Sequence, residues 1–521
     1  MEVGVRLIGL VLRLLNFFLA PLFWFRSRDP RRLPPIEKPL LLQSATEIAA
    51  AIRNGLVTSE KVVRAYVERI QEVNVYLNAV VDERYRAALE DAKAIDRQLA
   101  EARSKGTLDE LVASKPLLGV PFTVKESCSL GGLSNAVGCL ENAGSRALID
   151  GEAVALVKAA GAIPLLVSNT PELCLGWETT NLLRGTTNNP YDLARTPGGS
   201  SGGEGALLAS GAACFGVASD IAGSVRVPAA FCGVFAHKPT PGIIPIGGHI
   251  PTLADELYPK FLTVGPMTRK AEDLPLLLSV MAGEKAKELR LQEPVDMKTV
   301  KVHYMLESTK SLALLTVAPS IASAIKRAVH YLHTSCGATV SEEKFVDLED
   351  SVEISVSVFF SMKDIPNMLR DPANPKQDKS LALELLQHAL GGARRSLQAL
   401  GFALIARHQL FIPAHRRAFY REKAERLRDQ ITKTLGTTGV FLYPVFNDLA
   451  HQHGQVYCRA SGVMYSMVFN VLGLPATAVP MGLHRGLPVS IQVIAAPRQD
   501  RLCLAVARRL EEAFGGWRPP R

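Results

Sequence analysis

Hydrophobic positions along the chain follow two different periods. From residue 44 onward, amphipathic stretches with the 3.6-residue spacing of helices are separated by short apolar runs of the length of buried strands. The first stretch begins at Ser44, carries Glu47 three residues later in the pattern of a capping box, and ends at Gly55. Further helices are predicted over residues 59–73, 84–102, 152–161 and 501–514, and strands over 117–125, 162–168, 214–219, 439–445 and 487–496.

This alternation of strands and helices predicts an α/β fold. We expect a central mixed, largely parallel sheet that is covered by helices on both faces. The predicted sheet and helices form one large domain over residues 33–521, preceded by a separate segment over residues 1–32. Residues from about 300 to 430 differ, because their helical stretches are longer and combine apolar with arginine-rich faces. This region is interpreted either as a second membrane-contacting element or as a buried helix pair.

The N-terminal segment, residues 3–25, is apolar apart from Arg6, Arg13 and one asparagine. Its uninterrupted apolar run is shorter than the roughly 20 residues of a spanning helix, and Arg13 at mid-depth would cost about 2.5 to 3.5 kcal/mol. A strained span is one interpretation. A second is a helix, or a hairpin bent at Pro21, that lies in the interface with both arginines reaching head groups. A buried helix of the core is the third.

We predict a retained membrane anchor, because no small-residue cleavage site follows the apolar segment. The arginine-rich flank after residue 25 favours a cytoplasmic catalytic domain if the segment spans a membrane. The expected location is the surface of the endoplasmic reticulum or of a lipid droplet.

Composition and charge narrow the function classes. The chain has 521 residues, 47% of them hydrophobic and 21% charged, which describes a folded chain with a sizeable core. Its formal net charge of +9 reflects arginine clusters in residues 6–32 and 394–428. Both clusters adjoin apolar runs, so a membrane surface is expected rather than nucleic acid. The eight cysteines include no C-x-x-C pair, and His451 and His453 lack a third ligand nearby, so we expect no metal and no cofactor.

Residues 196–205, TPGGSSGGEG, contain five glycines and two serines. The pattern of a phosphate-binding P-loop and that of a dinucleotide-binding loop are both absent from this stretch. The stretch satisfies G-x-S-x-G twice, with Ser200 or Ser201 at the centre, as in the nucleophile elbow of α/β-hydrolases. That elbow should directly follow a strand, whereas Thr196 and a proline precede the glycines here.

A third interpretation uses more of the chain. Ser224 lies 24 residues after Ser200 among small residues, with Asp220 four positions before it. Lys125 is a single cation at the end of an apolar run. Taken alone, a lysine at a strand end usually reaches water and a serine before a helix usually caps it.

Together these motifs resemble the amidase signature family of serine hydrolases. The resemblance rests on GGSSGG, a following D-x-x-G-S-x-R-x-P and an upstream V-K-E, and it extends from about Leu41 to Trp517. It implies that Ser224 is the nucleophile, that Ser200 is a bridging serine preceded by a cis peptide bond, and that Lys125 is the base. A lysine must be neutral to accept a proton, and burial disfavours its charged form.

The resemblance also implies supporting roles around this triad. The backbone N–H groups of the loop before the nucleophile form an oxyanion hole, the loop at Cys174 faces the substrate, and Ser201, Asp220 and Arg226 brace the site. At position 222 the family usually has glycine, whereas this chain has alanine, which keeps the N–H but is strained if φ must be positive. The expected oxyanion-hole residues are Ile221, Ala222, Gly223 and Ser224.

Within the family, the N-terminal apolar segment makes the chain most similar to fatty-acid amide hydrolases. That similarity implies a membrane-associated enzyme that cleaves long-chain primary amides and N-acyl ethanolamides to fatty acid plus ammonia or amine. Its partners would be a lipid amide and a membrane or lipid-droplet surface, with a homodimer left open. Two alternatives remain: a member that acts on a soluble amide, like the amidotransferase subunits, and a lipid-binding pseudoenzyme in which Ala222 has disabled the oxyanion hole.

Overall fold

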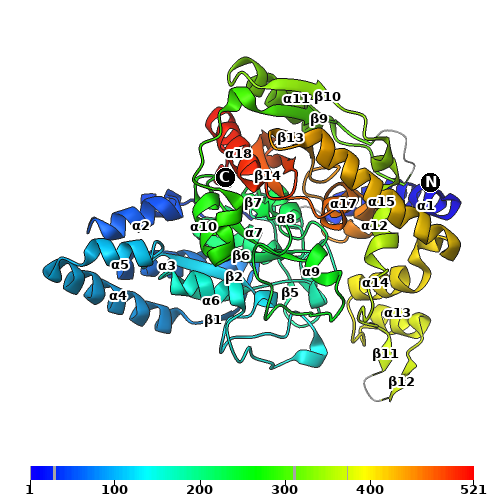
Figure 1. Ribbon diagram of the computed structural model, residues 1–521. Helices are drawn as coiled ribbons and strands as arrows, with labels where there is room; N and C mark the ends of the chain where they lie inside the picture. The colour runs from blue at the N-terminus through cyan, green and yellow to red at the C-terminus, as the bar shows by residue number, and fades with distance from the viewer. Residues whose placement is uncertain (1, 27–30, 309–312, 372–373, 521) are drawn as a thin grey trace.

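An eleven-stranded mixed sheet lies at the centre of the structure, a computed structural model that describes residues 2–26, 31–308, 313–371 and 374–520 (Figure 1). In spatial order its strands are β1 (Val80–Glu83), β3 (Ile163–Ser168), β2 (Pro121–Lys125), β6 (Phe215–Asp220), β8 (Thr263–Thr268), β7 (Phe235–Lys238), β14 (Ala476–His484), β15 (Leu487–Ala495), β13 (Gly439–Pro444), β9 (Lys301–Tyr304) and β10 (Thr339–Glu342).

The predicted mixed sheet is confirmed, with fewer parallel pairs than expected. Parallel pairing is found at the two ends, in β3–β2–β6 and in β13–β9–β10. The middle of the sheet is antiparallel, because β8 runs against both of its neighbours and β14 and β15 form a hairpin. The strands β2, β3, β6 and β13 are buried along their whole length, which explains their continuous apolar sequences.

Helices cover both faces of this sheet, as predicted. One layer contains four helices, each in contact with the next: α6 (Glu152–Ala159), α10 (Asp273–Ala282), α18 (Asp500–Phe514) and α11 (Pro319–Thr334). The other layer contains α7 (Gly202–Ala209), α8 (Arg226–Cys232), α12 (Ser351–Phe359), α15 (Ala414–Leu435) and α17 (Met464–Val471). The glycine-rich stretch 196–205 and the loop that carries Ser224 therefore lie around α7 and α8 in the second layer.

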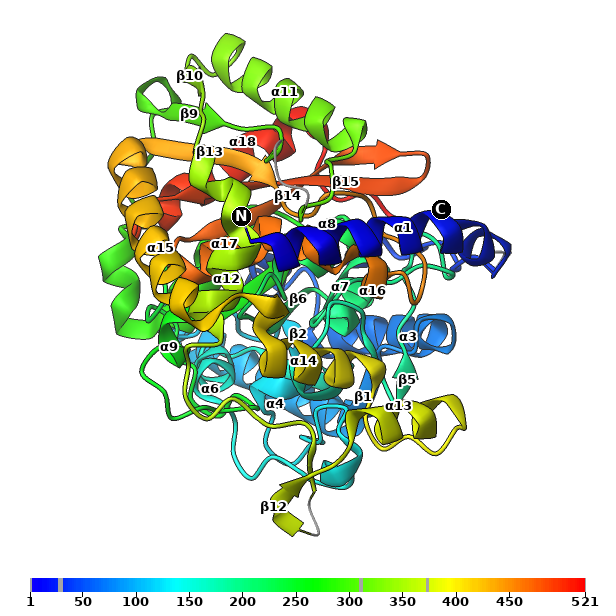
Figure 2. The same ribbon diagram turned by 90° about the vertical axis from the view of Figure 1, so that its right-hand side faces the viewer.

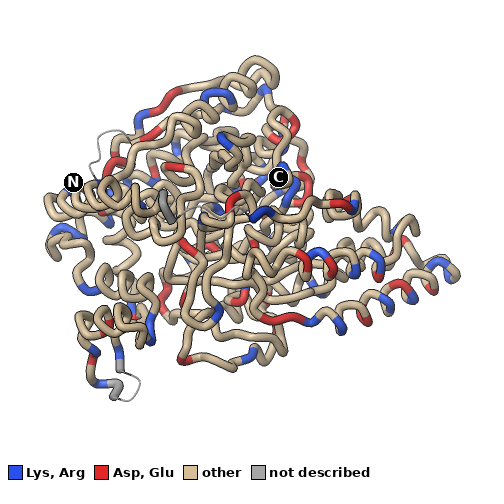
Figure 3. Tube along the Cα trace, turned by 180° about the vertical axis from the view of Figure 1, so that it is seen from behind, with Lys and Arg blue, Asp and Glu red and all other residues tan. Residues whose placement is uncertain are grey.

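A charged helical arm extends from the end of the sheet at β1 (Figure 1). Its first helix has the predicted capping box, in which the Ser44 side chain accepts from the Glu47 N–H and the Glu47 side chain accepts from the Ser44 N–H. Lys/Arg and Asp/Glu alternate along the arm (Figure 3). Its members are α2 (Ala45–Arg53), α3 (Ser59–Leu77), α4 (Tyr85–Lys105) and α5 (Leu108–Ser114).

The remaining elements lie mostly on the side opposite the arm (Figure 2). They are α1 (Val3–Arg26), α9 (Tyr258–Phe261), α13 (Leu381–Ala389), α14 (Leu397–His408), the 3-10 helices η4 (Glu172–Cys174) and η8 (Gln409–Phe411), α16 (Val456–Arg459), and the two-stranded pairs β4 (Thr180–Asn181) with β5 (Gly185–Thr186) and β11 (Arg370–Asp371) with β12 (Asn374–Asp378).

Helix α1 lies across the catalytic body (Figure 2). Its stretch Val3–Phe23 is long and apolar enough to cross a membrane, with a mean hydropathy of 1.9, although length and composition alone are weak evidence. At its start, the Glu2 carboxylate accepts from Arg416 on α15 at 3.0 Å and from the Tyr420 hydroxyl at 2.7 Å. The Arg13 guanidinium donates to the Leu314 carbonyl. Arg13 thus binds the protein itself, and the prediction that it reaches lipid head groups is wrong for this arrangement.

The side of α1 that faces away from the body is apolar and exposed. It adjoins η8, which contacts α14, and α14 in turn contacts α13. We call the exposed apolar side chains of these elements the outer apolar surface. They are Val3, Leu7, Leu10, Val11, Leu14, Leu15, Phe17, Phe18, Leu22, Leu383, Leu385, Leu386, Leu390, Leu404 and Phe411.

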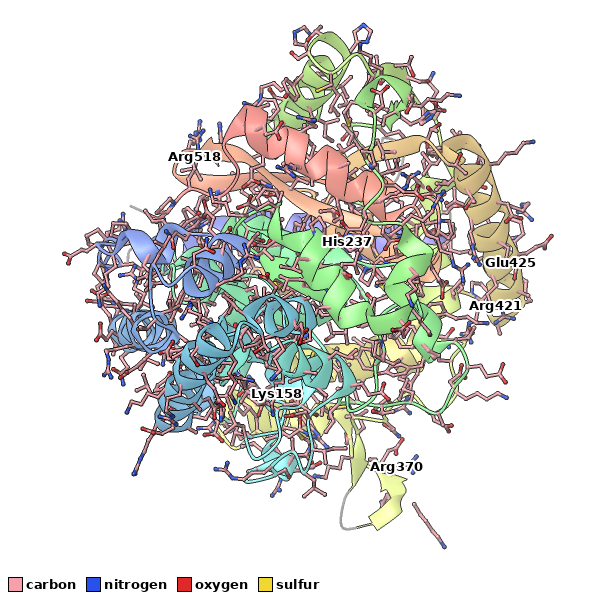
Figure 4. The ribbon with its side chains drawn as sticks, turned by 60° about the vertical axis from the view of Figure 1, so that its left-hand side comes forward. Lys158, His237, Arg370, Arg421, Glu425 and Arg518 are labelled. Carbon is pink, nitrogen blue, oxygen red and sulfur yellow. The ribbon has the colours of Figure 1, made fainter. Side chains whose placement is uncertain are left out.

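The arginines in residues 394–428 include a buried, ion-paired side chain and several exposed ones. Arg395 is buried and pairs with Glu141 and Glu172, so it does not face a membrane as the sequence suggested. Arg394, Arg407 and Arg421 are exposed near the outer apolar surface. Figure 4 shows Arg421 and Glu425 projecting outward from α15.

Candidate active site

The buried strand β2 ends at Lys125 and directs its side chain toward the two serine loops. The Lys125 side chain is fully buried. Its Nζ lies 2.7 Å from Ser200 Oγ, 3.0 Å from Ser219 Oγ and 3.3 Å from the Ser219 carbonyl oxygen. Lys125 therefore joins the glycine-rich stretch to the end of β6.

The glycine-rich stretch turns sharply before α7. The peptide bond between Gly199 and Ser200 is cis, as the family resemblance implies, and Gly198 has φ 86°. A Cβ at Gly199 would lie 2.8 Å from the Gly176 carbonyl oxygen and the Glu178 nitrogen, so only glycine fits against that neighbouring loop. The Ser201 N–H donates to the Ser224 carbonyl at 3.1 Å and links the two serine loops.

The loop between β6 and α8 carries Ser224 and is braced by Asp220. The Asp220 carboxylate accepts from the Val225 N–H at 3.1 Å and from the Arg226 guanidinium at 3.0 and 3.1 Å. Burial alone would raise the pKa of Asp220, but the adjacent Arg226 charge lowers it well below its ordinary value. Arg226 also donates to Ser466, Asn470 and Gln492 and thereby fixes this loop to α17 and β15.

The same loop shows where positive φ is needed. Gly223 has φ 93°, and a Cβ there would lie 2.8 Å from Ser466 Cβ. The residues with positive φ do not include Ala222, so the alanine at the position where the family usually has glycine avoids the strain considered from the sequence. The Ala222 carbonyl accepts from Trp177 Nε1 at 3.1 Å.

The amide groups of this loop are used unequally. The Gly223 N–H donates to Asp220 Oδ1 at 2.7 Å. This N–H was expected to be an oxyanion-hole donor, but here it is already hydrogen-bonded within the protein. Within the part of the chain that the structure describes, no acceptor is found for the N–H groups of Ile221, Ala222 and Ser224. These three amides remain as donors for a developing oxyanion.

Both serines line one small cavity of about 50 Å³. Cys174 lies in its wall, on a tight turn where Leu173 and Cys174 both have positive φ, at 48° and 60°. Most of the wall is apolar. The lining side chains are Leu173, Cys174, Leu175, Ser200, Ser219, Ile221, Ser224, His249, Pro251, Leu253, Tyr258, Leu262, Phe359, Ile365, Pro366 and Phe402.

Sequence reasoning missed several lining residues, notably Ser219, His249, Tyr258, Phe359 and Phe402. Ser219 directly precedes the aspartate of the motif and was within reach of that pattern. The others come from distant loops and helices, and no local sequence signal marks them.

The two closely spaced histidines lie outside this cavity. His451 is buried, with its ring edge-on to Phe231 and stacked near Phe446, because its loop folds against α8. His453 bonds to Glu178 at 2.9 Å and to Asn188 at 3.1 Å.

Comparisons with known proteins agree with this fold and site. A family model described as Amidase matches residues 61–504. The chain is 41% identical to fatty-acid amide hydrolase 2-A of Danio rerio, over 99% of this chain and 97% of that protein. It is 39% identical to fatty-acid amide hydrolase 2 of Homo sapiens, over 98% and 95% of the two chains. A solved structure described as fatty acid amide hydrolase has a TM-score of 0.73 at 20% identity, covering 93% of this chain and 87% of that one, and supports the fold alone.

The fold is the amidase signature fold, and its site holds a buried lysine beside two serines. The chain belongs to the amidase family, as the motifs predicted, and is an amidase.

Proposed function

We propose that this chain is a membrane-associated serine hydrolase that converts long-chain fatty-acid primary amides and N-acyl ethanolamides to fatty acid plus ammonia or amine. One observation carries the proposal: Lys125 Nζ lies 2.7 Å from Ser200 Oγ in a buried cavity that Ser224 shares and apolar side chains surround. The names of the similar proteins point to the same substrate class.

In the proposed reaction, neutral Lys125 accepts the hydroxyl proton of Ser200 while Ser200 accepts that of Ser224. Ser224 Oγ then attacks the amide carbonyl carbon, and the negative oxygen is stabilised by the N–H groups of Ile221, Ala222 and Ser224. Losing one such donor typically costs about 2.7 to 4 kcal/mol. When the C–N bond breaks, the relay returns the proton to the leaving nitrogen, which departs poorly as an anion. Water then attacks the acyl-enzyme and releases the fatty acid.

The walls of the cavity fit an acyl chain better than a polar substrate. Beyond the serines the lining is formed by side chains such as Leu253, Phe359 and Phe402, and Phe402 belongs to α14. Helix α14 is also part of the outer apolar surface, so the cavity wall and the exposed apolar side chains share one element. A lipid substrate entering from a membrane would meet apolar surface along its path.

We propose that residues 1–32 and the outer apolar surface together hold the enzyme at a membrane. A contiguous exposed apolar face of this kind is typical of membrane or partner contact. Exposed Arg394, Arg407 and Arg421 are suited to anionic head groups beside it. The expected site is the cytoplasmic surface of the endoplasmic reticulum or of a lipid droplet.

The proposal is tested with the purified full-length chain in phospholipid vesicles containing oleamide or N-oleoylethanolamine. We expect release of oleic acid, abolished in Ser224→Ala. A fluorophosphonate probe should label the wild type and Ser201→Ala but not Ser224→Ala. A labelled enzyme that cleaves a short soluble amide and leaves oleamide intact would reject the lipid substrate, and absence of labelling would reject catalysis by Ser224.

A further inference from the structure

His249 is a buried imidazole in the catalytic cavity that the reaction above does not use. It lies in the loop between β7 and α9, where it is 4% exposed. Its Nε2 lies 2.9 Å from Ser219 Oγ, and its Nδ1 lies 3.1 Å from both the Pro251 carbonyl oxygen and the Tyr258 hydroxyl. The loop is fixed close by, since the Ile250 N–H donates to the Ser127 carbonyl at 2.9 Å.

The direction of these hydrogen bonds follows from their partners. A carbonyl oxygen only accepts, so Nδ1 carries the ring proton and donates it to Pro251. In a neutral ring Nε2 is then an acceptor, and it receives the hydroxyl proton of Ser219. The Tyr258 hydroxyl does not compete for Nδ1, because it donates to the same Pro251 carbonyl.

The surroundings keep this ring neutral. Burial is the main cause that lowers the pKa of His249 to about 3. The other titratable groups near it are the Tyr258 phenol and, next to that phenol, the thiols of Cys128 and Cys174. The carboxylate of Asp220, which directly follows Ser219, is held by Arg226.

This arrangement determines the direction of the hydrogen bond between Ser219 and Lys125. The Ser219 hydroxyl uses its only proton in the hydrogen bond to His249 Nε2. Ser219 Oγ can therefore only accept a hydrogen bond from Lys125 Nζ, 3.0 Å away. A neutral lysine has two N–H donors and one lone pair. If the two donors are directed to Ser219 Oγ and to the Ser219 carbonyl oxygen, the lone pair is left for the Ser200 hydroxyl at 2.7 Å.

We propose that His249 is a positioning residue for the base: it holds the Ser219 hydroxyl proton away from Lys125 so that the Nζ lone pair faces Ser200. Without His249, the Ser219 hydroxyl is free to donate to Nζ and compete with Ser200 for the one acceptor site. The inference rests on the proposed role of Lys125 and does not depend on which amide is the substrate.

The experiment is a double-mutant cycle between His249 and Ser219. In His249→Phe we expect kcat to fall roughly 10- to 100-fold, less than the loss of a general base itself, with KM within about threefold. His249→Gln, which offers an amide oxygen as acceptor, should recover most of the rate. In a Ser219→Ala background there is no competing hydroxyl, so His249→Phe should cause little further loss. The histidine control is His303→Phe, on β9 at the far end of the sheet, which should retain the wild-type rate.

Equal losses of kcat from His249→Phe in the wild-type and Ser219→Ala backgrounds would overturn the proposal. A rise in KM with kcat unchanged would also overturn it, because His249 would then act by contacting the substrate. The rate of fluorophosphonate labelling of Ser224 is measured alongside, because it reports activation of the nucleophile without any amide. If the chain fails to cleave fatty-acid amides, the cycle is still decided by that labelling rate. His249→Gln and Ser219→Ala keep the test decisive if His249→Phe does not fold.

Discussion

Single buried residues set the electrostatics around Lys125. Glu204, in the glycine-rich stretch, is fully buried on α7 and accepts from the Thr123 hydroxyl at 2.5 Å on the neighbouring strand β2. Burial is the main cause that raises the pKa of Glu204 to about 7, while the hydrogen bond from Thr123 opposes this rise. The carboxyl is therefore protonated in the folded state over a pH range where it ionises in the unfolded chain.

This shift predicts a specific pH dependence of stability. Because the folded-state pKa is above the unfolded value of 4.5, the stabilising contribution is complete below pH 4.5 and is lost as the pH rises through about 7. Between pH 5 and 8 the wild type should lose about 2 to 3 kcal/mol of unfolding free energy relative to Glu204→Gln. Urea unfolding of both proteins at the two pH values measures the difference. A difference that stays constant across this range would contradict the assignment.

At the scale of elements, one buried ion pair connects α14 to the loop at Cys174. Arg395 immediately precedes α14 and donates to Glu172 in η4 at 2.9 Å and to Glu141 at 2.6 Å. The Ser396 N–H donates to the second oxygen of Glu172 at 2.8 Å. The start of α14 is thus held against the turn that forms one wall of the cavity.

Removing this ion pair should destabilise the protein and disturb the cavity wall. Arg395→Gln leaves the buried Glu172 carboxylate without its cation, a change that typically costs about 3 to 5 kcal/mol. The neighbouring Arg394→Gln is the control, because Arg394 is exposed. Replacing an exposed side chain usually changes the free energy of unfolding by less than about 0.5 kcal/mol. Chemical denaturation compares the two variants. Equal effects would show that the pair does not hold the element.

At the scale of the whole molecule, the outer apolar surface and the charged arm lie on opposite sides (Figures 2 and 3). The outer apolar surface combines α1 with α13, although more than 350 residues separate them in the sequence. The arm α2–α5 carries alternating charges that suit water. This asymmetry would orient the molecule with the outer apolar surface toward a membrane.

Charges placed on that surface should release the protein from membranes. We expect Phe17→Glu/Phe18→Glu to reduce sedimentation with phospholipid vesicles at least about tenfold, because both rings are about 70% exposed and burying a carboxylate in lipid is costly. Val75→Glu, at a residue on α3 that is similarly exposed, is the control and should bind as the wild type does. Hydrolysis of detergent-dispersed substrate should be unchanged in all three proteins. Equal vesicle binding by the double variant would reject the orientation.

Local patterns predicted much of the fold and the chemical centre. Runs such as residues 162–167 are apolar throughout because β3 is buried on both faces, and the cap at Ser44 is formed with Glu47, only three residues away. Lys125, Ser200 and Ser224 were proposed as a triad because a contiguous motif surrounds each of them. His249 and Phe402 were not, since they reach the cavity through contacts between segments far apart in the chain. Arg395 looked like part of a basic surface, because it stands next to Arg394 in an arginine-rich stretch while its partners Glu141 and Glu172 are distant in the sequence.

The contact between Glu2 and α15 has a consequence for how the protein is made. Arg416 and Tyr420 follow α1 by about 390 residues, so at ribosomal speeds of about 5 to 20 residues per second they emerge roughly 20 to 80 s after it. During that interval α1 is an apolar helix without its partner on the catalytic body. Any factor that binds apolar helices would therefore meet α1 before Arg416 and Tyr420 do.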